Sequence, residues 1–245
     1  MFPGIGTAIN VIAIVVGSGL GVLIGSKMPQ RTRGLITDVL GLTVLLSAAG
    51  AFIPLWSKSF VGSLPKGWAL LAILAALLLG GLVGSMARLE DRLANLGESL
   101  RVRFKASSES NFVQGFVSAS LLFAIGPLSI LGSISDGMST GIDQLLLKSS
   151  LDFFAAMAFS ASLGWGVAVA ALPVGIYQGF WTVVGVFLGS VLVAYQVDAM
   201  TITGGVLLFC IGLKLLNIKT VAVGNLLPAL AFAPVIAWGL HLLTV

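Results

Sequence analysis

Two oppositely charged residues, four positions apart inside a long apolar run, are the pair in this sequence best suited to chemistry. Lys148 and Asp152 lie within the apolar run 143–171. In a helix that starts at residue 143, Asp152 lies about 13 Å along the axis. An ionised carboxylate near the middle of a membrane costs at least about 2.5 kcal/mol, so a partner or a functional reason is expected. Lys148, one turn earlier, can be that partner, which leaves a structural ion pair and a binding site as alternatives.

A second group of polar residues follows a proline in the run 112–134. Pro127 has no N–H for the carbonyl of Phe123, and Gly126 loosens the same turn, so the sequence predicts a kinked or broken helix. A carbonyl freed inside a membrane needs a partner, which can be water, a hydroxyl or a transported ion. The polar residues that come next, at helical spacing on one side, are Ser129, Ser133 and Asp136. They predict either an ion or solute site or a polar cap at the outer surface.

Glycines at four-residue spacing mark one face of the first apolar run, residues 4–26. Gly17, Gly21 and Gly25 present hydrogen atoms in place of side chains. This pattern predicts a close contact with another helix. Asn10, earlier in the same run, brings an amide into the membrane. It either hydrogen-bonds to a neighbouring helix or contributes to a binding site.

Residues that usually carry catalysis or hold metals are scarce. Cys210 is the single cysteine and His241 the single histidine, which excludes a disulfide framework and a thiol metal cluster. The sequence contains no HExxH, paired CxxC or P-loop, and its serine-rich stretches have no nearby histidine base. We therefore expect no enzymatic activity, no cofactor and no metal site.

Apolar runs of membrane-spanning length position these polar residues. Of 245 residues, 58% are hydrophobic and 9% are charged, whereas an ordinary soluble domain has about 25% charged residues. We therefore predict an all-α fold, a polytopic transmembrane helix bundle of about eight spans that forms a single domain over residues 1–245. The apolar runs are 4–26, 35–55, 67–86, 112–134, 143–171, 179–197, 200–216 and 221–243.

Lysine and arginine are distributed unevenly between the connections. With an external amino terminus, ten of the 13 fall inside and two, Lys58 and Lys66, fall outside, while Lys148 lies in a span. Because cytoplasmic connections retain positive charge, we predict that both termini are external. The net charge of +4 then reflects topology. We expect the lipid bilayer, and no nucleic acid, as the partner.

The longest connection, at about residues 87–111, mixes acidic and basic side chains. They are Arg88, Glu90, Asp91, Arg92, Glu98, Arg101, Arg103 and Lys105. This composition predicts a solvated amphipathic helix at the cytoplasmic face, with its basic members near anionic lipid.

A short element with the pattern Gly-x-x-x-Gly-Ser recurs near the ends of three spans. Its copies are residues 21–26, 80–85 and 185–190. In the predicted topology the third copy runs in the opposite direction to the first two. Opposed copies would fit an inverted repeat, a common plan among transporters, or the chance recurrence of glycine-rich apolar sequence.

Three motifs give the sequence a family resemblance. They are GTAIN with the following glycine ladder (Gly6 to Gly25), GPLSILGSISDG (Gly126 to Gly137) and KSSLD (Lys148 to Asp152). In this order, over nearly the whole chain, the sequence resembles the YdfK/YqgA-like family of bacterial membrane proteins, which carries a domain-of-unknown-function label (DUF554). The resemblance implies a multi-pass protein of the bacterial cytoplasmic (inner) membrane and no settled substrate. It also implies a Met or small residue at the position of Pro127, so the kink would be particular to this chain.

Polar residues and helix-breaking elements converge on the fourth and fifth runs without a catalytic set. We therefore predict a transporter or permease for a small ion or polar solute. The residues expected at its binding site are Asn10, Ser129, Ser133, Asp136, Lys148 and Asp152. An ion channel is the nearest alternative. Another is a non-transporting assembly or structural protein, in which the polar side of the fifth run joins the subunits of a homo-oligomer.

Overall fold

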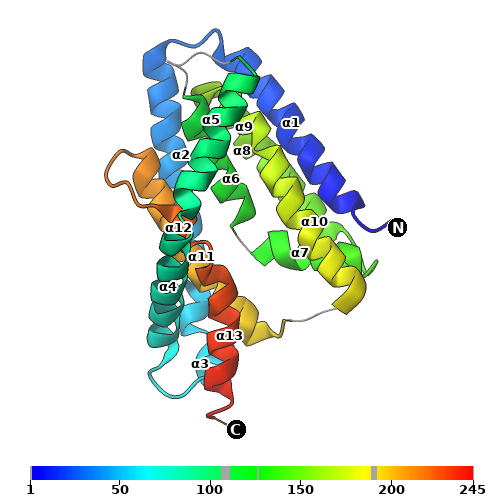
Figure 1. The fold of residues 1–245 in the computed structure, drawn as a ribbon, viewed down its shortest axis with the longest axis vertical. Helices are drawn as coiled ribbons and strands as arrows, with labels where there is room; N and C mark the ends of the chain where they lie inside the picture. Colours follow the sequence, from blue (N-terminus) through cyan, green and yellow to red (C-terminus); the bar gives the residue numbers. More distant parts are fainter. Residues whose placement is uncertain (1, 106–110, 126, 189–191, 245) are drawn as a thin grey trace. The chain divides into compact units, whose positions relative to one another are not determined.

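Helices make up every regular element in the part of the chain that the structure describes. The computed structural model describes residues 2–105, 111–125, 127–188 and 192–244. The longer helices are α1 (Ile5–Gly25), α2 (Gln30–Ala51), α4 (Ala69–Met86), α5 (Leu89–Arg103), α6 (Phe112–Ala124), α7 (Pro127–Gly137), α8 (Asp143–Leu163), α10 (Ala171–Leu188), α11 (Ala194–Leu215) and α13 (Ala229–His241) (Figure 1). The short ones are η1 (Ile53–Trp56), α3 (Lys58–Gly62), α9 (Gly166–Val169) and α12 (Val223–Leu226). The prediction of an all-α fold is confirmed.

Seven helical segments of the described residues are long and apolar enough to cross a membrane. They are Ile5–Gly25, Gln30–Trp56, Ala69–Met86, Asp143–Leu163, Gly166–Phe187, Ala194–Leu215 and Val223–His241. The helices α6 and α7 form a further, bent pair, and the total is eight if this pair is one span. The prediction of about eight spans is confirmed.

The bent pair of α6 and α7 is broken at the proline. The helix α6 ends at Ala124, α7 starts at Pro127, and the two helices are bent by 62°. Pro127 thus begins a helix instead of interrupting one, which suits a residue that has no backbone N–H to donate. Gly126, the other residue of the predicted kink, lies outside the described residues.

The boundaries between the fifth, sixth and seventh spans differ from those predicted. The sequence predicts spans at 143–171 and 179–197, whereas α8 ends at Leu163 and α10 extends from Ala171 to Leu188. Gly164 has a φ of +79°, so the helix stops there. Pro173 lies in the first turn of α10, where a missing N–H breaks no helical hydrogen bond. Hydropathy does not reveal this break, because the residues on both sides of it are apolar.

The chain folds into two compact units, Met1–Leu40 with Leu93–Val191 and Gly41–Arg92 with Leu192–Val245. In the first unit α1 packs along α8 and also contacts α7 and α10, while α7 packs on α8 and α10. Side chains buried in this unit include Ile14, Phe116, Phe123, Leu145 and Phe159. Every residue of the predicted site belongs to this unit. The prediction of a single membrane domain spans both units and stays a prediction.

The second unit has a small apolar core. The helix α4 packs against α12 and α13, and α11 packs against α13. Phe60, Ile73 and Ile202 are buried there among alanines. The carboxylate of Glu90 accepts the N–H of Gly224 at 2.6 Å and lies 3.4 Å from the Nζ of Lys214. This contact ties the start of α5 to α11 and α12.

The helix α5 forms the described part of the charged connection predicted at about 87–111. Most of its side chains are exposed. Glu98 accepts a hydrogen bond from the Nε of Arg101 at 2.7 Å, which holds the pKa of the Glu98 carboxyl below its ordinary value. Residues 106–110 lie outside the described part of the chain.

The recurring Gly-x-x-x-Gly-Ser element occurs where helices touch. A Cβ atom on Gly21, Gly80 or Gly185 would overlap a backbone atom of another helix. The backbone atoms concerned belong to Met157, Ala229 and Ile134, respectively. The first glycine of each copy therefore permits a close approach of two backbones. Residues 189 and 190 of the third copy lie outside the described residues, and the inverted repeat stays a prediction.

Candidate functional site

Glycines bring α1 against α8 and so set the separation of the polar residues on the two helices. A Cβ atom at Gly17, Gly21 or Gly25 would overlap a carbonyl oxygen of α8. These oxygens belong to Phe153, Met157 and Ala161. Both sets repeat every four residues, so the backbones stay in contact over about two turns. Asn10 is buried on the same side of α1, so its side chain lies next to α8.

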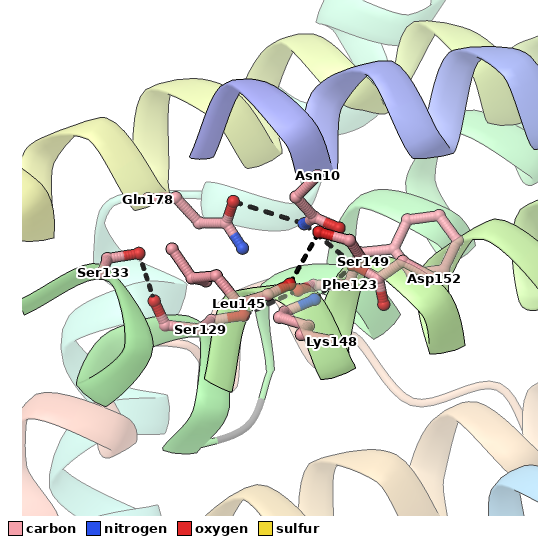
Figure 2. Close-up of polar contacts among 9 residues, drawn as sticks. All are labelled: Asn10, Phe123, Ser129, Ser133, Leu145, Lys148, Ser149, Asp152 and Gln178. Atoms are coloured by element: carbon pink, nitrogen blue, oxygen red, sulfur yellow. Dashed lines mark hydrogen bonds and ion pairs between the residues drawn. The ribbon is translucent and has the colours of Figure 1, made fainter. Parts of the chain in front are cut away.

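Asp152 is the centre of a buried polar cluster that joins three helices (Figure 2). Its Oδ2 accepts hydrogen bonds from the Nζ of Lys148, on the same helix, and from the Nδ2 of Asn10 at 3.0 Å. The same Nδ2 group donates to the Oε1 of Gln178, on α10, at 3.2 Å. The exposed fractions are 0% for Asn10 and Gln178, 6% for Lys148 and 7% for Asp152. The cluster of Asn10, Lys148, Asp152 and Gln178 is therefore a polar site in the interior of the first unit.

Two atoms of this cluster have no hydrogen-bond partner among the described residues. They are the Oδ1 of Asn10, an acceptor, and the Nε2 of Gln178, a donor. A buried polar atom left unpaired costs about 1–3 kcal/mol. The cluster can therefore offer one acceptor and one donor to a further molecule, in addition to its two charges.

An aromatic ring lies near the ammonium of the cluster. The Nζ of Lys148 is 6.0 Å from the centre of the Phe123 ring, at the end of α6. A cation at this distance from an aromatic face is attracted by about 0.5–2 kcal/mol, and more strongly where water is excluded. The broken fourth span thus contributes a ring to the surroundings of Lys148.

The serine hydroxyls of the predicted site are engaged elsewhere. Ser129 donates to the carbonyl of Phe123 at 2.9 Å, and Ser133 donates to the carbonyl of Ser129 at 2.6 Å (Figure 2). The carbonyl that Pro127 leaves unbonded therefore has a hydroxyl as its partner, which is one of the partners that the sequence leaves open. Ser149, on α8, likewise donates to a carbonyl of its own helix, that of Leu145.

Asp136, on α7, is not part of the cluster around Asp152. It lies next to the amino-terminal end of α1. Its Oδ2 accepts the backbone N–H of Gly6 at 3.1 Å. A carboxylate at this end of a helix is stabilised by the unpaired N–H groups of the first turn. Asp136 is 2% exposed, and its Oδ1 has no partner among the described residues.

The structure brings together some of the predicted site residues and separates others. Asn10, Lys148 and Asp152 form one cluster, and Asp136 contacts α1 one turn from Asn10. Ser129 and Ser133 are buried, but their hydrogen bonds stay within the fourth span. The part that these residues play in binding stays a prediction.

Gln178 is the member of the cluster that the sequence analysis misses. The predicted spans 143–171 and 179–197 leave it in a connection, so its burial is not expected. The signal that identifies it is an amide within an apolar stretch, followed four residues later by Thr182. Thr182 is also buried, and its Oγ1 lies 3.2 Å from the Oγ1 of Thr7 on α1.

Helices of membrane-spanning length, a broken span and a buried cluster with charged members define a multi-pass α-helical membrane protein with a polar interior. The chain belongs to the family described as "Protein of unknown function (DUF554)", which it matches over residues 5–238. The resemblance inferred from the three motifs is thereby confirmed.

Two relatives cover almost the whole chain. "Uncharacterized protein YqgA" of Escherichia coli (strain K12) is 33% identical over 233 residues, which are 94% of each chain. "Uncharacterized membrane protein YdfK" of Bacillus subtilis (strain 168) is 28% identical over 236 residues, which are 96% of each chain. No solved structure matches the chain.

Proposed function

We propose that this protein is a membrane transporter for a small ion or polar solute, and that the cluster of Asn10, Lys148, Asp152 and Gln178 is its binding site. The observation that carries the proposal is the convergence of these four buried side chains from α1, α8 and α10, with an acceptor and a donor left over. Ionisable residues within membrane spans are costly and usually line the path of an ion or solute.

The balance of buried charge favours a cation. In the first unit the buried charged side chains among the described residues are Asp136, Lys148 and Asp152. Two carboxylates against one ammonium leave one net negative charge. A small cation or a protonatable solute would neutralise this charge, whereas an anion would add to it.

A structural ion pair is the second candidate for this site, because Lys148 already bonds to Asp152. A scaffold, however, needs only the two charges. It gains nothing from two amides that each leave one polar atom unpaired, at a cost of about 1–3 kcal/mol per atom. The amides of Asn10 and Gln178 therefore support a binding role over a purely structural one.

The test compares ion flux and stability in the same variants. Purified protein in liposomes is exposed to steps of Na⁺, K⁺ or pH, and the resulting current is recorded. We expect the native protein to carry current with at least one of these cations. Asp152→Asn should abolish this current while the protein still folds, since the amide keeps the shape and removes the charge. Asp143→Asn is the matched control, because Asp143 is an exposed carboxylate of the same helix.

The structural alternative makes a different prediction for the same variants. If the pair is only a scaffold, Asp152→Asn leaves Lys148 buried and unpaired and lowers stability by about 3–5 kcal/mol. Adding Lys148→Met would then restore both stability and current. Native current in a folded Asp152→Asn protein would refute the assignment of the binding site, and no current from the native protein with any of the three cations would refute the proposal of a cation transporter.

We also propose that the protein lies in the bacterial cytoplasmic membrane with both termini outside. The support is the distribution of Lys and Arg, ten on one side and two on the other. In this topology the connection between α7 and α8 faces outward, on the side of the membrane nearer to Asp136 than to the glycine contacts of α1.

A further inference from the structure

We propose that Asp136 is a proton-binding residue of this transporter and that its charge controls the order of the first turn of α1, the helix that also carries Asn10 of the cluster. The proposal rests on the proposed function. It assigns to Asp136 a regulatory role that differs from solute binding.

The first observation is the position of the carboxylate. Asp136 is 2% exposed, yet no cation bonds to it among the described residues. One oxygen accepts the N–H of Gly6, and the other has no partner. The free oxygen can accept a proton without breaking any hydrogen bond of the described structure, and the carboxylate then becomes a neutral carboxyl group.

The surroundings favour a proton over a metal cation at this position. A metal ion would need several oxygen ligands, and one free carboxylate oxygen supplies too few. A proton needs only the one oxygen.

Few other groups can titrate next to Asp136. Its neighbouring elements are α1, α8 and α10. Among the described residues, α1 carries no charged side chain. The titratable groups of the other two are Asp143, Lys148, Asp152 and Tyr177. Asp143 is exposed at the start of α8, and Lys148 and Asp152 bond to each other, so Asp136 is the buried carboxylate without a cationic partner.

The second observation is that α1 donates a hydrogen bond to each of the two carboxylates. Gly6 of α1 donates to Asp136, and Asn10, four residues later on the same face, donates to Asp152. Thr7 lies between them and contacts Thr182 of α10. A hydrogen bond to a charged acceptor is about twice as strong as one to a neutral acceptor. Protonation of Asp136 therefore loosens the first turn of α1, and this turn is continuous with the one that carries Asn10.

The experiment follows the first turn of α1 directly and needs no transported solute. A nitroxide spin label is attached at Ile5→Cys in a Cys210→Ser background, in lipid nanodiscs. Its mobility is recorded from about pH 8 down to about pH 3, below the ordinary pKa of an aspartate. A second label at Leu20→Cys, in the carboxyl-terminal half of the same helix, is the positional control. Asp143→Asn is the charge control.

We expect the mobile fraction of the label at position 5 to rise at least about threefold as the pH falls, because the charge-assisted bond to Gly6 is weakened. The label at position 20 should not respond. Asp136→Asn should show the mobile spectrum at every pH, and Asp143→Asn should respond as the native protein does. Asp136→Glu, which keeps the charge, should respond with a shifted midpoint.

Two results would overturn the proposal. One is a label at position 5 that does not respond to pH in the protein with Asp136 intact, a result that does not depend on the folding of any Asp136 variant. The other is a pH response in Asp136→Asn equal to that of the native protein. Loss of ion current in the liposome assay, with the label response intact, would refute the transport function and leave the proton-binding role of Asp136 standing.

Discussion

One serine hydroxyl compensates for the break between α6 and α7, which lies in an apolar environment. Pro127 leaves the carbonyl of Phe123 without its helical donor, and Ser129 supplies the missing hydrogen bond at 2.9 Å. Phe123 and Ser129 are both buried. In a membrane protein no bulk water is present to replace such a bond. The serine is therefore expected to stabilise the break, and it does not need a role in solute binding.

The stability of a serine variant tests this role. Ser129→Ala should lower the free energy of unfolding by about 1–3 kcal/mol, because a buried carbonyl loses its partner. Unfolding in detergent, followed by circular dichroism, measures the change. Ser150→Ala is the matched control, since the Ser150 hydroxyl also donates to a carbonyl of its own helix, that of Leu146, but is exposed. Equal stability of the two variants would show that water or another donor reaches the Phe123 carbonyl.

At the scale of helices, the face of α1 that carries glycine is what places Asn10 beside Asp152. The face of α1 with Gly17, Gly21 and Gly25 lies against carbonyl oxygens of α8. A change in the separation of the two helices would therefore also move the polar cluster. Gly19, on the same helix, has no heavy atom within 4 Å of the position of a Cβ. The contrast between these glycines follows from which side of α1 faces α8.

This contrast predicts different outcomes for two substitutions in one helix. Gly21→Leu should lower the folded yield and reduce stability by about 1–3 kcal/mol or more, because a side chain must be forced between two backbones. Gly19→Leu should leave both unchanged. Thermal unfolding in detergent measures the stability, and size-exclusion chromatography measures the folded yield. If the two variants behave alike, the contact between α1 and α8 does not depend on the glycine face.

At the scale of the whole molecule, the predicted topology can be tested by chemical labelling. Cysteines at Thr32 and Ser99 should be protected from a membrane-impermeant maleimide in intact cells and should react after permeabilisation, since positive charge is retained inside. A cysteine at Ser59 should react from outside. All three positions are exposed, and Cys210→Ser removes the native thiol. Labelling of Thr32→Cys or Ser99→Cys in intact cells would contradict external termini.

Gly97 is a poor labelling position in the same connection. A Cβ there would lie 2.8 Å from the Cδ1 of Phe116, so a cysteine would disturb the packing of α5 on α6. Ser99, two residues later, is free of this contact. The mixed charge of α5 does not distinguish the two positions, because the sequence of the helix gives no direct indication of which side contacts α6.

Hydropathy, composition and charge were sufficient to predict an all-helical membrane protein with about eight spans, because these properties depend on the energy of each residue in lipid. The break near Pro127 follows from the missing N–H of proline. The spacing of Lys148 and Asp152 also predicts their pairing, since residues four apart share one helix face. Only the tertiary structure decided that Gln178 joins them, that Ser129 bonds to Phe123, and that Asp136 holds α1. These contacts join residues up to 168 positions apart in the sequence. They depend on how closely two helices pack and on where Gly164 ends one helix, which local sequence patterns do not determine.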